Sequence, residues 1–591
     1  MFNPNDKNNR LYYGNILSPP DNYDIDFAIA TTYSLDLDSL IGASISLGLS
    51  EDMDSELFDN AIFLLKALRK TSDNLVVFCE NGQIKLPSNK NSLYILLENS
   101  IFQVKTTKKF QKNRYSSFHP KIWLLRYSNN EEKCLYKIII LSRNLTFDRS
   151  WDITFTMEGE KSEYTTHKND ALINFIEYLI EYTTDSTKAK KMKEIADELK
   201  YIHFTLDSST FDNFEFFVNG INEKFSINNS PLFSDELEKL LIISPFLSNS
   251  VISDFNNRKT ENSRALLFTR LSSLSKLKAD DCDNFDIFTL KDEIIDGESI
   301  VSEDSQETSK QDIHAKMFFV ENKNYSELYL GSLNASYNAL FGNIEFMIKL
   351  KSDNYSLKQI TKDLFNGEMG DVNDPFQLVD INKIVPEETE SKKLDLIIKY
   401  ISRLNSKAKI ISYNDYFNIE LEFENINQDY LCDLSILIRP LLSENESNFS
   451  KYIIFKGLSK LELSEFFVIT VHDEDNKVSR VIKIKSEGMP SDRNKEVISS
   501  IIKDEKSFLE YIAFLLSDDY ILSAIENKTS DKSFNNINTA LPELYEKMLK
   551  AACYDPKKFN EIEFLISSLS DDNIIPKGFE ELYNTFLKVI D

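Results

Sequence analysis

Two of only five histidines in this 591-residue chain stand in the same short pattern, a histidine followed two residues later by a lysine. The copies are His119–Lys121 and His314–Lys316. Because side chains alternate along a strand, each imidazole is expected on the same face as its lysine. Such a pair offers a nucleophile or a proton donor beside a positive charge, which suits chemistry on an anion.

A strand-like run follows each pattern and ends in Ser-x-Asn, so that the two polar side chains again share a face. Asn144 lies 25 residues after His119, and Asn334 lies 20 residues after His314. Either histidine alone would be interpreted as a buried structural residue. The matched sets favour one catalytic site built from His119, Lys121, Asn144, His314, Lys316 and Asn334, with Ser142 and Ser332 supporting it or contacting the substrate.

The elements that must position these residues also occur twice. Strand-like runs are expected at 24–32, 74–79, 118–125 and 135–141, and again at 239–245, 264–269, 313–320 and 327–330, with helical spacing at 57–69 and 251–257. Strands alternating with helices predict an α/β fold with a largely buried sheet. Two such series about 200 residues apart predict a duplication with pseudo-twofold symmetry.

This arrangement resembles the phospholipase D superfamily, in which two H-x-K motifs meet at one active site. The second copy, HAKMFFV…LYLGSLNAS, is the better match. The family often carries an acidic residue five positions after the lysine, where this chain has Arg126 and Glu321. That departure is similar to the tyrosyl-DNA phosphodiesterase branch, which uses His, Lys and Asn. The resemblance covers residues 20–385 and not the C-terminal third.

The resemblance implies a phosphodiesterase that forms a covalent phosphohistidine, with His119 as nucleophile and His314 as general acid and base, although the pseudo-symmetry leaves the reverse open. Lysines and amides would stabilise charge on the phosphate oxygens. The lysines occupy places that metal ions fill in other phosphoryl-transfer sites, so we expect no metal and no cofactor. Glu345 is the expected orienting carboxylate for one histidine, and Asp152 is a weaker candidate.

A basic segment precedes the first pattern in an otherwise acidic chain. The formal charge is −27, from 95 acidic and 68 basic residues, which argues against a protein that coats polyanions generically. Between Glu98 and Glu131, however, there is no acidic residue. This window predicts a binding surface for nucleic acid through Lys105, Lys108, Lys109, Lys112 and Arg114; the alternative is a solvated loop. The acidic stretch 292–312 is expected to be an insertion that could compete with substrate.

Composition excludes several other classes of protein. No Gly-Lys dipeptide and no G-x-G-x-x-G occur, so nucleotide-binding loops are absent, and no H-E-x-x-H occurs. Five widely spaced cysteines predict reduced thiols. No signal core or membrane-spanning run is present, so we expect a cytoplasmic protein with no membrane partner.

The predicted organisation is a first phospholipase D-like half at 1–225, a second half at 226–388 and an accessory region at 389–591, with strands followed by helices. The favoured function is cleavage of nucleic acid, most plausibly DNA. The protein would be either an endonuclease or an end-processing enzyme. By analogy, it would serve prokaryotic restriction or anti-phage defence. The accessory region is a candidate for binding a partner protein. The alternatives are a phospholipase or phosphatidyltransferase, and a catalytically degenerate assembly subunit.

Overall fold

The computed structural model describes the chain except for residues 1–12, 50–59, 107–108, 112–113, 130, 132, 148–149, 209, 228–229, 231, 233–235, 292–311, 366–373, 385–391, 415, 432–433, 474–475, 517–536, 555, 570–573 and 591. The chain divides into two compact units. The first comprises residues 1–40, 73–86 and 100–403, and the second comprises residues 41–72, 87–99 and 404–591. Both patterns of chemically useful residues lie in the first unit.

The first half of the first unit is a seven-stranded sheet in the order β11-β10-β8-β7-β1-β2-β4. β1, β2 and β4 run parallel, and the other neighbours pair antiparallel. β1 is buried on both faces along most of its length, as expected for a continuous apolar run in the middle of a sheet. The strands are β1 Asp24–Thr32, β2 Leu75–Glu80, β4 Ile101–Val104, β7 Ile122–Ser128, β8 Cys134–Leu141, β10 Thr154–Lys161 and β11 Ile202–Thr205.

The second half is an eight-stranded sheet in the order β12-β19-β18-β17-β13-β14-β15-β20. Its path repeats that of the first sheet strand for strand from β19 to β15, with the same parallel and antiparallel neighbours. The predicted α/β duplication is therefore confirmed. The strands are β12 Asn213–Asn219, β13 Leu237–Ile243, β14 Lys259–Phe268, β15 Phe285–Leu290, β17 Met317–Glu321, β18 Ser326–Gly331, β19 Glu345–Ser352 and β20 Phe376–Leu378.

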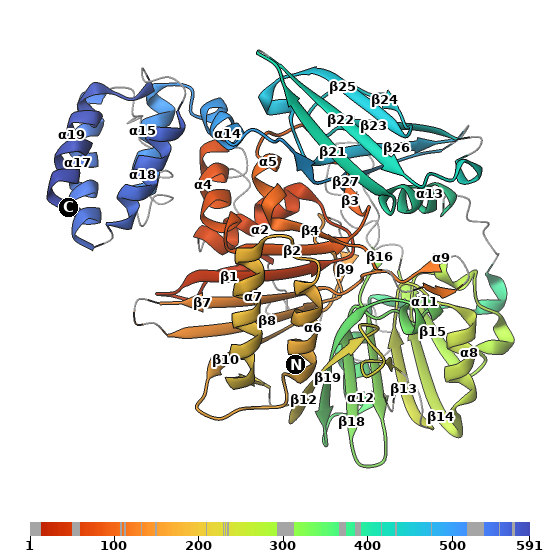
Figure 1. The fold of residues 1–591 in the computed structure, drawn as a ribbon. Helices are drawn as coiled ribbons and strands as arrows, with labels where there is room; N and C mark the ends of the chain where they lie inside the picture. Colours follow the sequence, from red (N-terminus) through yellow and green to blue (C-terminus); the bar gives the residue numbers. More distant parts are fainter. Residues whose placement is uncertain are drawn as a thin grey trace. The chain divides into compact units, whose positions relative to one another are not determined.

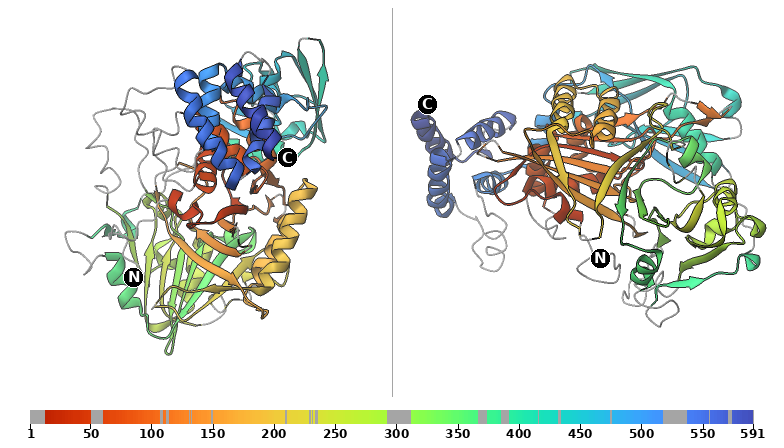
Figure 2. Two further views of the ribbon diagram at one scale, coloured as in Figure 1. Left: turned by 90° about the vertical axis from the view of Figure 1, so that its left-hand side faces the viewer. Right: turned by 90° about the horizontal axis from the view of Figure 1, so that it is seen from below.

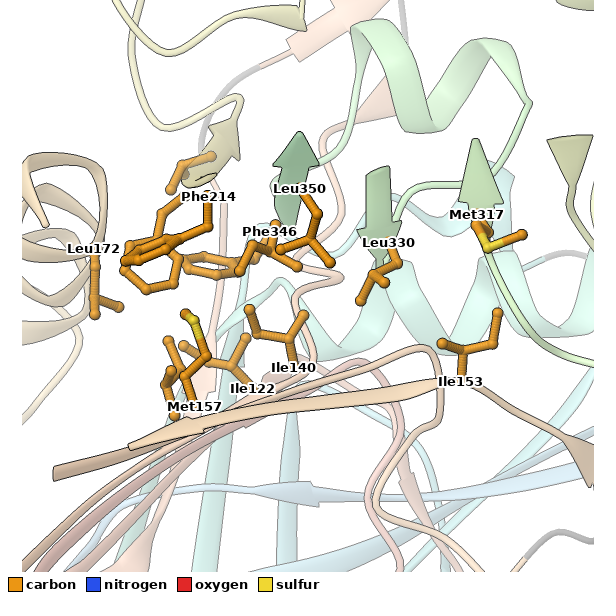
Figure 3. Close-up of a cluster of buried hydrophobic side chains, with 14 of the residues drawn as sticks. Ile122, Ile140, Ile153, Met157, Leu172, Phe214, Met317, Leu330, Phe346 and Leu350 are labelled. Carbon is orange, nitrogen blue, oxygen red and sulfur yellow. The ribbon is translucent and has the colours of Figure 1, made fainter. Parts of the chain in front are cut away.

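A hydrophobic core shared by the two sheets joins the halves. Ile122 and Ile140 from the first sheet belong to the same buried cluster as Leu330 and Phe346 from the second, and Figure 3 shows the two sets facing each other. Leu172 adds α6 to this cluster. Because the apolar faces of both sheets are buried against each other, the strand ends that carry the polar residues are held in a fixed relation.

Helices cover the outer parts of the first unit. α6 and α7 pack side by side against the first sheet, where Figure 1 and the right-hand view of Figure 2 both place them. The helices in this unit are α1 Tyr13–Leu17, α6 Asp170–Ile180, α7 Ser186–Glu198, α8 Asn249–Asn257, α9 Leu271–Leu274, α11 Tyr337–Phe341, α12 Leu357–Phe365 and α13 Lys392–Ser402. α2 Leu37–Leu49 starts here and ends in the second unit; short strands are β3 Ile84–Lys85, β5 Lys109–Gln111, β6 Arg114–Tyr115, β9 Ser150–Trp151 and β16 Asp312–Ile313.

The second unit contains strands followed by helices, as predicted for the C-terminal region. One set of strands runs β25-β22-β21-β28 and another runs β24-β23-β26-β27. The strands are β21 Asn405–Ser412, β22 Phe417–Glu424, β23 Ser435–Pro440, β24 Ser447–Asn448, β25 Tyr452–Leu458, β26 Phe466–His472, β27 Lys477–Lys483 and β28 Ser486–Glu487; the helices are α14 Arg493–Ile501, α15 Glu505–Leu516, α17 Ile537–Tyr554, α18 Lys557–Ser568 and α19 Lys577–Ile590.

Segments far upstream complete this second unit. α4 (Ala61–Ser72) and α5 (Tyr94–Leu97) belong to it, and α4 packs against α15. The second sheet likewise starts at β12, upstream of the predicted boundary at residue 225, because β12 pairs with β19. The predicted boundary near 385–391 lies outside the described residues. Among the described residues, no helix has both the length and the apolar character to cross a membrane.

Candidate active site

The two His-x-Lys patterns lie immediately before strands rather than on them. β7 starts at Ile122 and β17 at Met317, so both strands begin later than the predicted strands at 118–125 and 313–320. Each lysine nevertheless stays beside its histidine, because its ammonium folds back onto the backbone. Lys121 Nζ donates to the carbonyl of His119 at 2.9 Å, and Lys316 Nζ donates to that of His314 at 2.7 Å.

Backbone pairing between the halves fixes the segment around each histidine. In the first, the amide of His119 donates to Ile344 O at 2.9 Å. In the second, the amides of His314 and Ala315 both donate to Trp151 O, at 3.0 and 2.9 Å. Ile344 and Trp151 immediately precede Glu345 and Asp152. The pairing therefore delivers a carboxylate from each half to the histidine of the other.

These crossed carboxylates contact the imidazoles directly. Glu345 Oε2 lies 2.8 Å from His119 Nδ1, and Asp152 Oδ1 lies 3.1 Å from His314 Nδ1. A carboxylate can only accept, so we assign a proton to Nδ1 of each ring. That assignment leaves Nε2 of His119 as the basic nitrogen, and Lys121 Nζ lies 3.0 Å from it.

The serines of the two Ser-x-Asn pairs hold the carboxylates. Ser142 Oγ donates to Asp152 Oδ1 at 3.1 Å, and Ser332 Oγ donates to Glu345 Oε2. Each serine oxygen also accepts the amide of the residue after the carboxylate, at 2.9 and 3.0 Å. The two halves thus repeat one hydrogen-bond pattern. This geometry supports the predicted supporting role, while direct contact of either serine with substrate stays a prediction.

The two asparagines lie directly after β8 and β18. Asn144 Oδ1 lies 3.5 Å from the amide nitrogen of Ser34. Asn334 is buried, and its Oδ1 accepts no hydrogen bond from the part of the chain that the structure describes. Buried polar atoms almost always have a partner, so the Asn334 amide is suited to a ligand in the site.

Lys316 links the two half-sites, since its Nζ also lies 3.3 Å from the carbonyl oxygen of Ser142 in the first half. Burial lowers the pKa of Lys121 to about 7, against the opposing effect of Glu345 and Asp152. Burial, and then the charge of Lys121, hold the pKa of Lys316 well below its ordinary value. Two ammonium groups in one buried site repel each other, and an anion between them would restore both pKa values.

Burial also keeps both imidazoles neutral without substrate. It lowers the pKa of His119 to about 4, although Glu345 acts in the opposite direction. Burial and the neighbouring Lys316 lower the pKa of His314 to about 3. Burial acts to raise the pKa of Asp152, but the hydrogen bond from His314 and further donors lower it to about 2. The site therefore offers neutral imidazoles beside two lysines whose charged forms a bound anion would favour.

The predicted basic window is only partly described. Lys105 is half-buried, and burial followed by the charge of Arg403 lowers its pKa. Lys109 and Arg114 lie on the strands of the β5–β6 hairpin, and Lys108 and Lys112 are outside the described residues. Contact of this segment with nucleic acid stays a prediction. Nearly all of the acidic stretch 292–312 is also outside the described residues.

Several residues at the site were not singled out from the sequence. Tyr33 places its ring 5.2 Å from that of His119, and Asn343 Nδ2 donates to Glu345 Oε1 at 3.0 Å. Glu80 and Arg270 hydrogen-bond the backbone just before the two histidines. Glu80 is the last residue of β2, and Arg270 follows the end of β14 by two residues. A polar residue at the end of a buried strand is the sequence signal that could have identified both.

Within the part of the chain that the structure describes, no group of three His, Cys, Asp or Glu residues could hold a metal ion.

No family model matches the sequence. A curated relative, an uncharacterized protein of Acanthamoeba polyphaga mimivirus, is 20% identical over 363 residues, which are 59% of this chain. The chain spans about a quarter of that relative's length, 24%.

The structure is remotely similar to three solved proteins. Yeast tyrosyl-DNA phosphodiesterase is 10% identical, with a TM-score of 0.33, over 58% of this chain and 86% of that one. Phosphatidylserine synthase of Haemophilus influenzae is 11% identical, with a TM-score of 0.33, over 65% and 93%. Polyphosphate kinase of Porphyromonas gingivalis is 11% identical, with a TM-score of 0.29, over 58% and 45%. These likenesses are remote, so the function proposed below rests on the side-chain geometry and on the resemblance of the sequence motifs.

Proposed function

We propose that the protein is a phosphodiesterase that cleaves nucleic acid in two steps through a phosphohistidine. The observation that carries this proposal is the crossed arrangement of His119 with Glu345 and His314 with Asp152 around two buried lysines. A scissile phosphate between the imidazoles would meet a nucleophile on one side and a proton donor on the other. Lys121, Lys316 and the asparagine amides would stabilise the charge on its nonbridging oxygens.

In the first step, Nε2 of His119 attacks phosphorus and the bond to the leaving oxygen breaks. Glu345 stabilises the positive charge that forms on the imidazole, because it accepts the Nδ1 proton. His314 donates a proton to the leaving oxygen. The substrate anion favours the protonated form of His314, which is neutral in the free protein.

In the second step, His314 removes a proton from water, and the resulting hydroxide attacks phosphorus. The P–N bond breaks and His119 is released in its original neutral form. Both steps need the same two lysines and amides, so no metal ion is required to hold the phosphate. The near-equivalence of the half-sites allows the reverse assignment, and our choice of His119 follows the family resemblance.

The substrate we propose is DNA, cleaved as an endonuclease or at an end, with the basic segment 105–114 binding the strand. A role in prokaryotic restriction or anti-phage defence extends the same proposal by analogy. Plaque counts on cells that express the wild-type protein or His119→Ala would test the extension. Equal plaque numbers in the two strains would contradict the defence role.

The cleavage proposal is tested with metal-free assays on single- and double-stranded DNA and RNA, with a chelator present. His119→Ala and His314→Ala should each lose activity, whereas His203→Ala, which removes an exposed histidine bonded to Tyr164 O, should retain it. Reactions of the wild type that are quenched with denaturant at alkaline pH, where the P–N bond is stable, should contain a phosphorylated histidine at position 119. A label at 314 instead would reverse the roles.

Other outcomes correspond to the other functions. Release of headgroups from phospholipid vesicles, without cleavage of any nucleic acid, would identify a lipid phosphodiesterase. A wild-type protein as inactive as both histidine variants on nucleic acid, lipid and generic phosphodiesters would identify an assembly subunit. Activity that a chelator abolishes and magnesium restores would contradict the two-lysine mechanism.

A further inference from the structure

Equivalent positions in the two half-sites carry opposite charges. Phe78 on β2 pairs with Thr31, and Phe268 on β14 pairs with Ile243. Counting two residues onward from each phenylalanine gives Glu80 and Arg270. The ends of the adjoining strands β1 and β13 support this alignment. Thr32 Oγ1 donates to Ser34 O and Ser244 Oγ donates to Phe246 O, so each hydroxyl bonds the carbonyl two residues later.

Both charged residues hold the backbone immediately before a histidine. Glu80 Oε2 accepts the amide of Phe118 at 2.8 Å, and Arg270 Nε donates to the carbonyl of Ile313 at 2.6 Å. The backbone before the histidine is thus held by a hydrogen-bond acceptor in the first half and by a donor in the second. Their surroundings, however, differ.

Glu80 is enclosed by protein. It is fully buried, and Oε1 lies 3.0 Å from Lys399 Nζ and 3.7 Å from Arg403 Nη2. Lys399 and Arg403 come from α13 and the residue just after it. A buried carboxylate held between two cations is a structural group that a substrate does not reach.

Arg270 lies nearer to solvent. Its side chain is 22% exposed, and its guanidinium carbon stands 5.2 Å from the centre of the Phe246 ring, which is 43% exposed. Asp312 Oδ2 is 3.7 Å from Nε. Arginine binds phosphate through its planar N–H groups, and an exposed aromatic ring stacks on bases of any sequence.

We propose that Arg270 and Phe246 form a subsite for the nucleotide next to the scissile phosphate on the His314 side. The guanidinium binds the flanking phosphate and the ring stacks on the base. Because the first half-site has Glu80 at the equivalent position, the two arms of the substrate meet different groups, and this difference sets the direction in which a strand lies. The inference rests on the proposed phosphodiesterase function.

A second observation places Arg270 within electrostatic reach of the reacting phosphate. Its charge is one of the causes that lower the pKa of Lys316, after burial and Lys121. The hydrogen bonds give the same adjacency, because Arg270 donates to the carbonyl of Ile313 and Lys316 donates to that of His314, the next residue. A phosphate at Arg270 would therefore be the neighbour of one held by Lys316. Substrates with one phosphate should not use this subsite, and longer strands should.

The test compares bis(p-nitrophenyl) phosphate, which has one phosphate and no base, with a single-stranded oligonucleotide. Arg270→Gln retains an N–H donor for Ile313 O but removes the charge. We expect KM for the oligonucleotide to rise about tenfold more than KM for the small substrate, and the salt dependence of oligonucleotide binding to fall by about one unit of slope. Phe246→Leu should raise KM for the oligonucleotide without changing the slope.

A matched control exists at the other end of the same strand. Arg258 precedes β14, stands 5.0 Å from the ring of Phe255, and donates to Leu232 O at 3.0 Å. Arg258→Gln therefore removes the same charge and a similar ring contact away from the histidines, and it should leave KM and the salt slope unchanged.

The outcomes separate this inference from the function on which it rests. Wild-type protein that cleaves neither substrate refutes the phosphodiesterase function. Wild-type protein that cleaves both, with Arg270→Gln indistinguishable from it or equally impaired on both substrates, refutes the subsite alone. Equal effects of Arg258→Gln and Arg270→Gln on KM also refute it, since they would reflect overall charge.

Discussion

The two histidines form one site because each half supplies the carboxylate that contacts the histidine of the other half. Glu345 and Asp152 each reach across to the imidazole of the other half, and a serine of their own half holds each in place. Among the described residues, no carboxylate contacts the histidine of its own half. A change at either acid should therefore affect the chemistry of the opposite half.

Replacing the carboxylates with amides tests this arrangement. Glu345→Gln keeps the size of the side chain but can donate to Nδ1 of His119, which moves the ring proton to the reacting nitrogen. We expect kcat to fall on the order of 10²–10⁴-fold, the range of acid–base contributions. Asp152→Asn should act in the same way on His314, and steady-state kinetics on one phosphodiester would measure both.

A matched substitution distinguishes orientation from loss of a buried charge. Glu327 is also buried in the second half, where it accepts from Tyr329 Oη at 2.7 Å. Glu327→Gln should keep kcat near that of the wild type. A comparable loss in this variant would show that the effect of Glu345→Gln arises from general destabilisation.

The lowered pKa values predict a pH profile for the free protein. His119, with a pKa of about 4, becomes a competent nucleophile above that pH, and Lys121, with a pKa of about 7, loses its charge above that one. The mechanism also needs a protonated His314, whose pKa in the free protein is about 3. kcat/KM should therefore be highest between the two histidine pKa values, decline above pH 4 and decline more steeply above pH 7. Because bound phosphate favours charged lysine, the alkaline limb of kcat should lie at higher pH. Coincident alkaline limbs of kcat and kcat/KM would contradict this assignment.

At the scale of strands and helices, the contacts of Arg126 and Glu321 explain why the sequence departs from the phospholipase D pattern that it resembles. These residues stand five positions after Lys121 and Lys316. Arg126 pairs with Asp26 and Glu198, and Glu321 pairs with Lys239. Both therefore make ion pairs within the fold, at a distance along the strand from the histidines. The missing acidic residue at 126 reflects packing of the sheet and gives no reason to regard the site as degenerate.

Sequence patterns predicted the elements better than their contacts. β1 was predicted with its observed limits, Asp24–Thr32, because its apolar run is continuous. The start of β7 was not, since Pro120 cannot donate to a ladder and the amide of His119 bonds to Ile344 of the other half. The sequence also did not show which histidine Glu345 contacts. A contact between the two halves depends on tertiary pairing and produces no periodic pattern in the sequence. Asp152 was ranked low, since its spacing from Asn144 differs from that of Glu345 and Asn334.

Glu80 should couple stability to activity. Glu80→Ala removes the acceptor for Phe118 and leaves Lys399 and Arg403 without their carboxylate, a change that typically costs about 3–5 kcal/mol. We expect a lower unfolding temperature and, at a temperature where the protein is still folded, a lower kcat. Thermal scans and kinetics on the same preparation would measure both.

Glu98 provides the control for Glu80, because it is a buried carboxylate of the second unit that lies 2.6 Å from Arg493. Glu98→Ala should lower the unfolding temperature as well, but should leave kcat unchanged below that transition. Loss of kcat in both variants would argue that Glu80 has no specific effect on the segment before His119.

At the scale of the whole molecule, the second unit is assembled from three stretches of sequence. Residues 41–72 and 87–99 join residues 404–591. Nothing in composition marks the two upstream stretches as different from their surroundings, which is why the sequence alone assigned them to the first half. Their contacts reveal the assignment: Lys66 Nζ donates to Phe514 O at 2.8 Å, and Arg69 donates to Tyr511 Oη at 3.1 Å.

This assembly predicts that the C-terminal region cannot be removed cleanly. A chain ending at Arg403 would expose the buried face of α4, whose Phe63 packs 5.3 Å from Phe514, and would leave Glu98 without Arg493. An unpaired buried charge and exposed apolar surface both favour aggregation. We expect residues 1–403 expressed alone to be largely insoluble, and co-expression with residues 404–591 to restore solubility with the two fragments purifying together. A soluble 1–403 fragment with the kcat of the full chain would show instead that residues 41–72 and 87–99 fold without the C-terminal region.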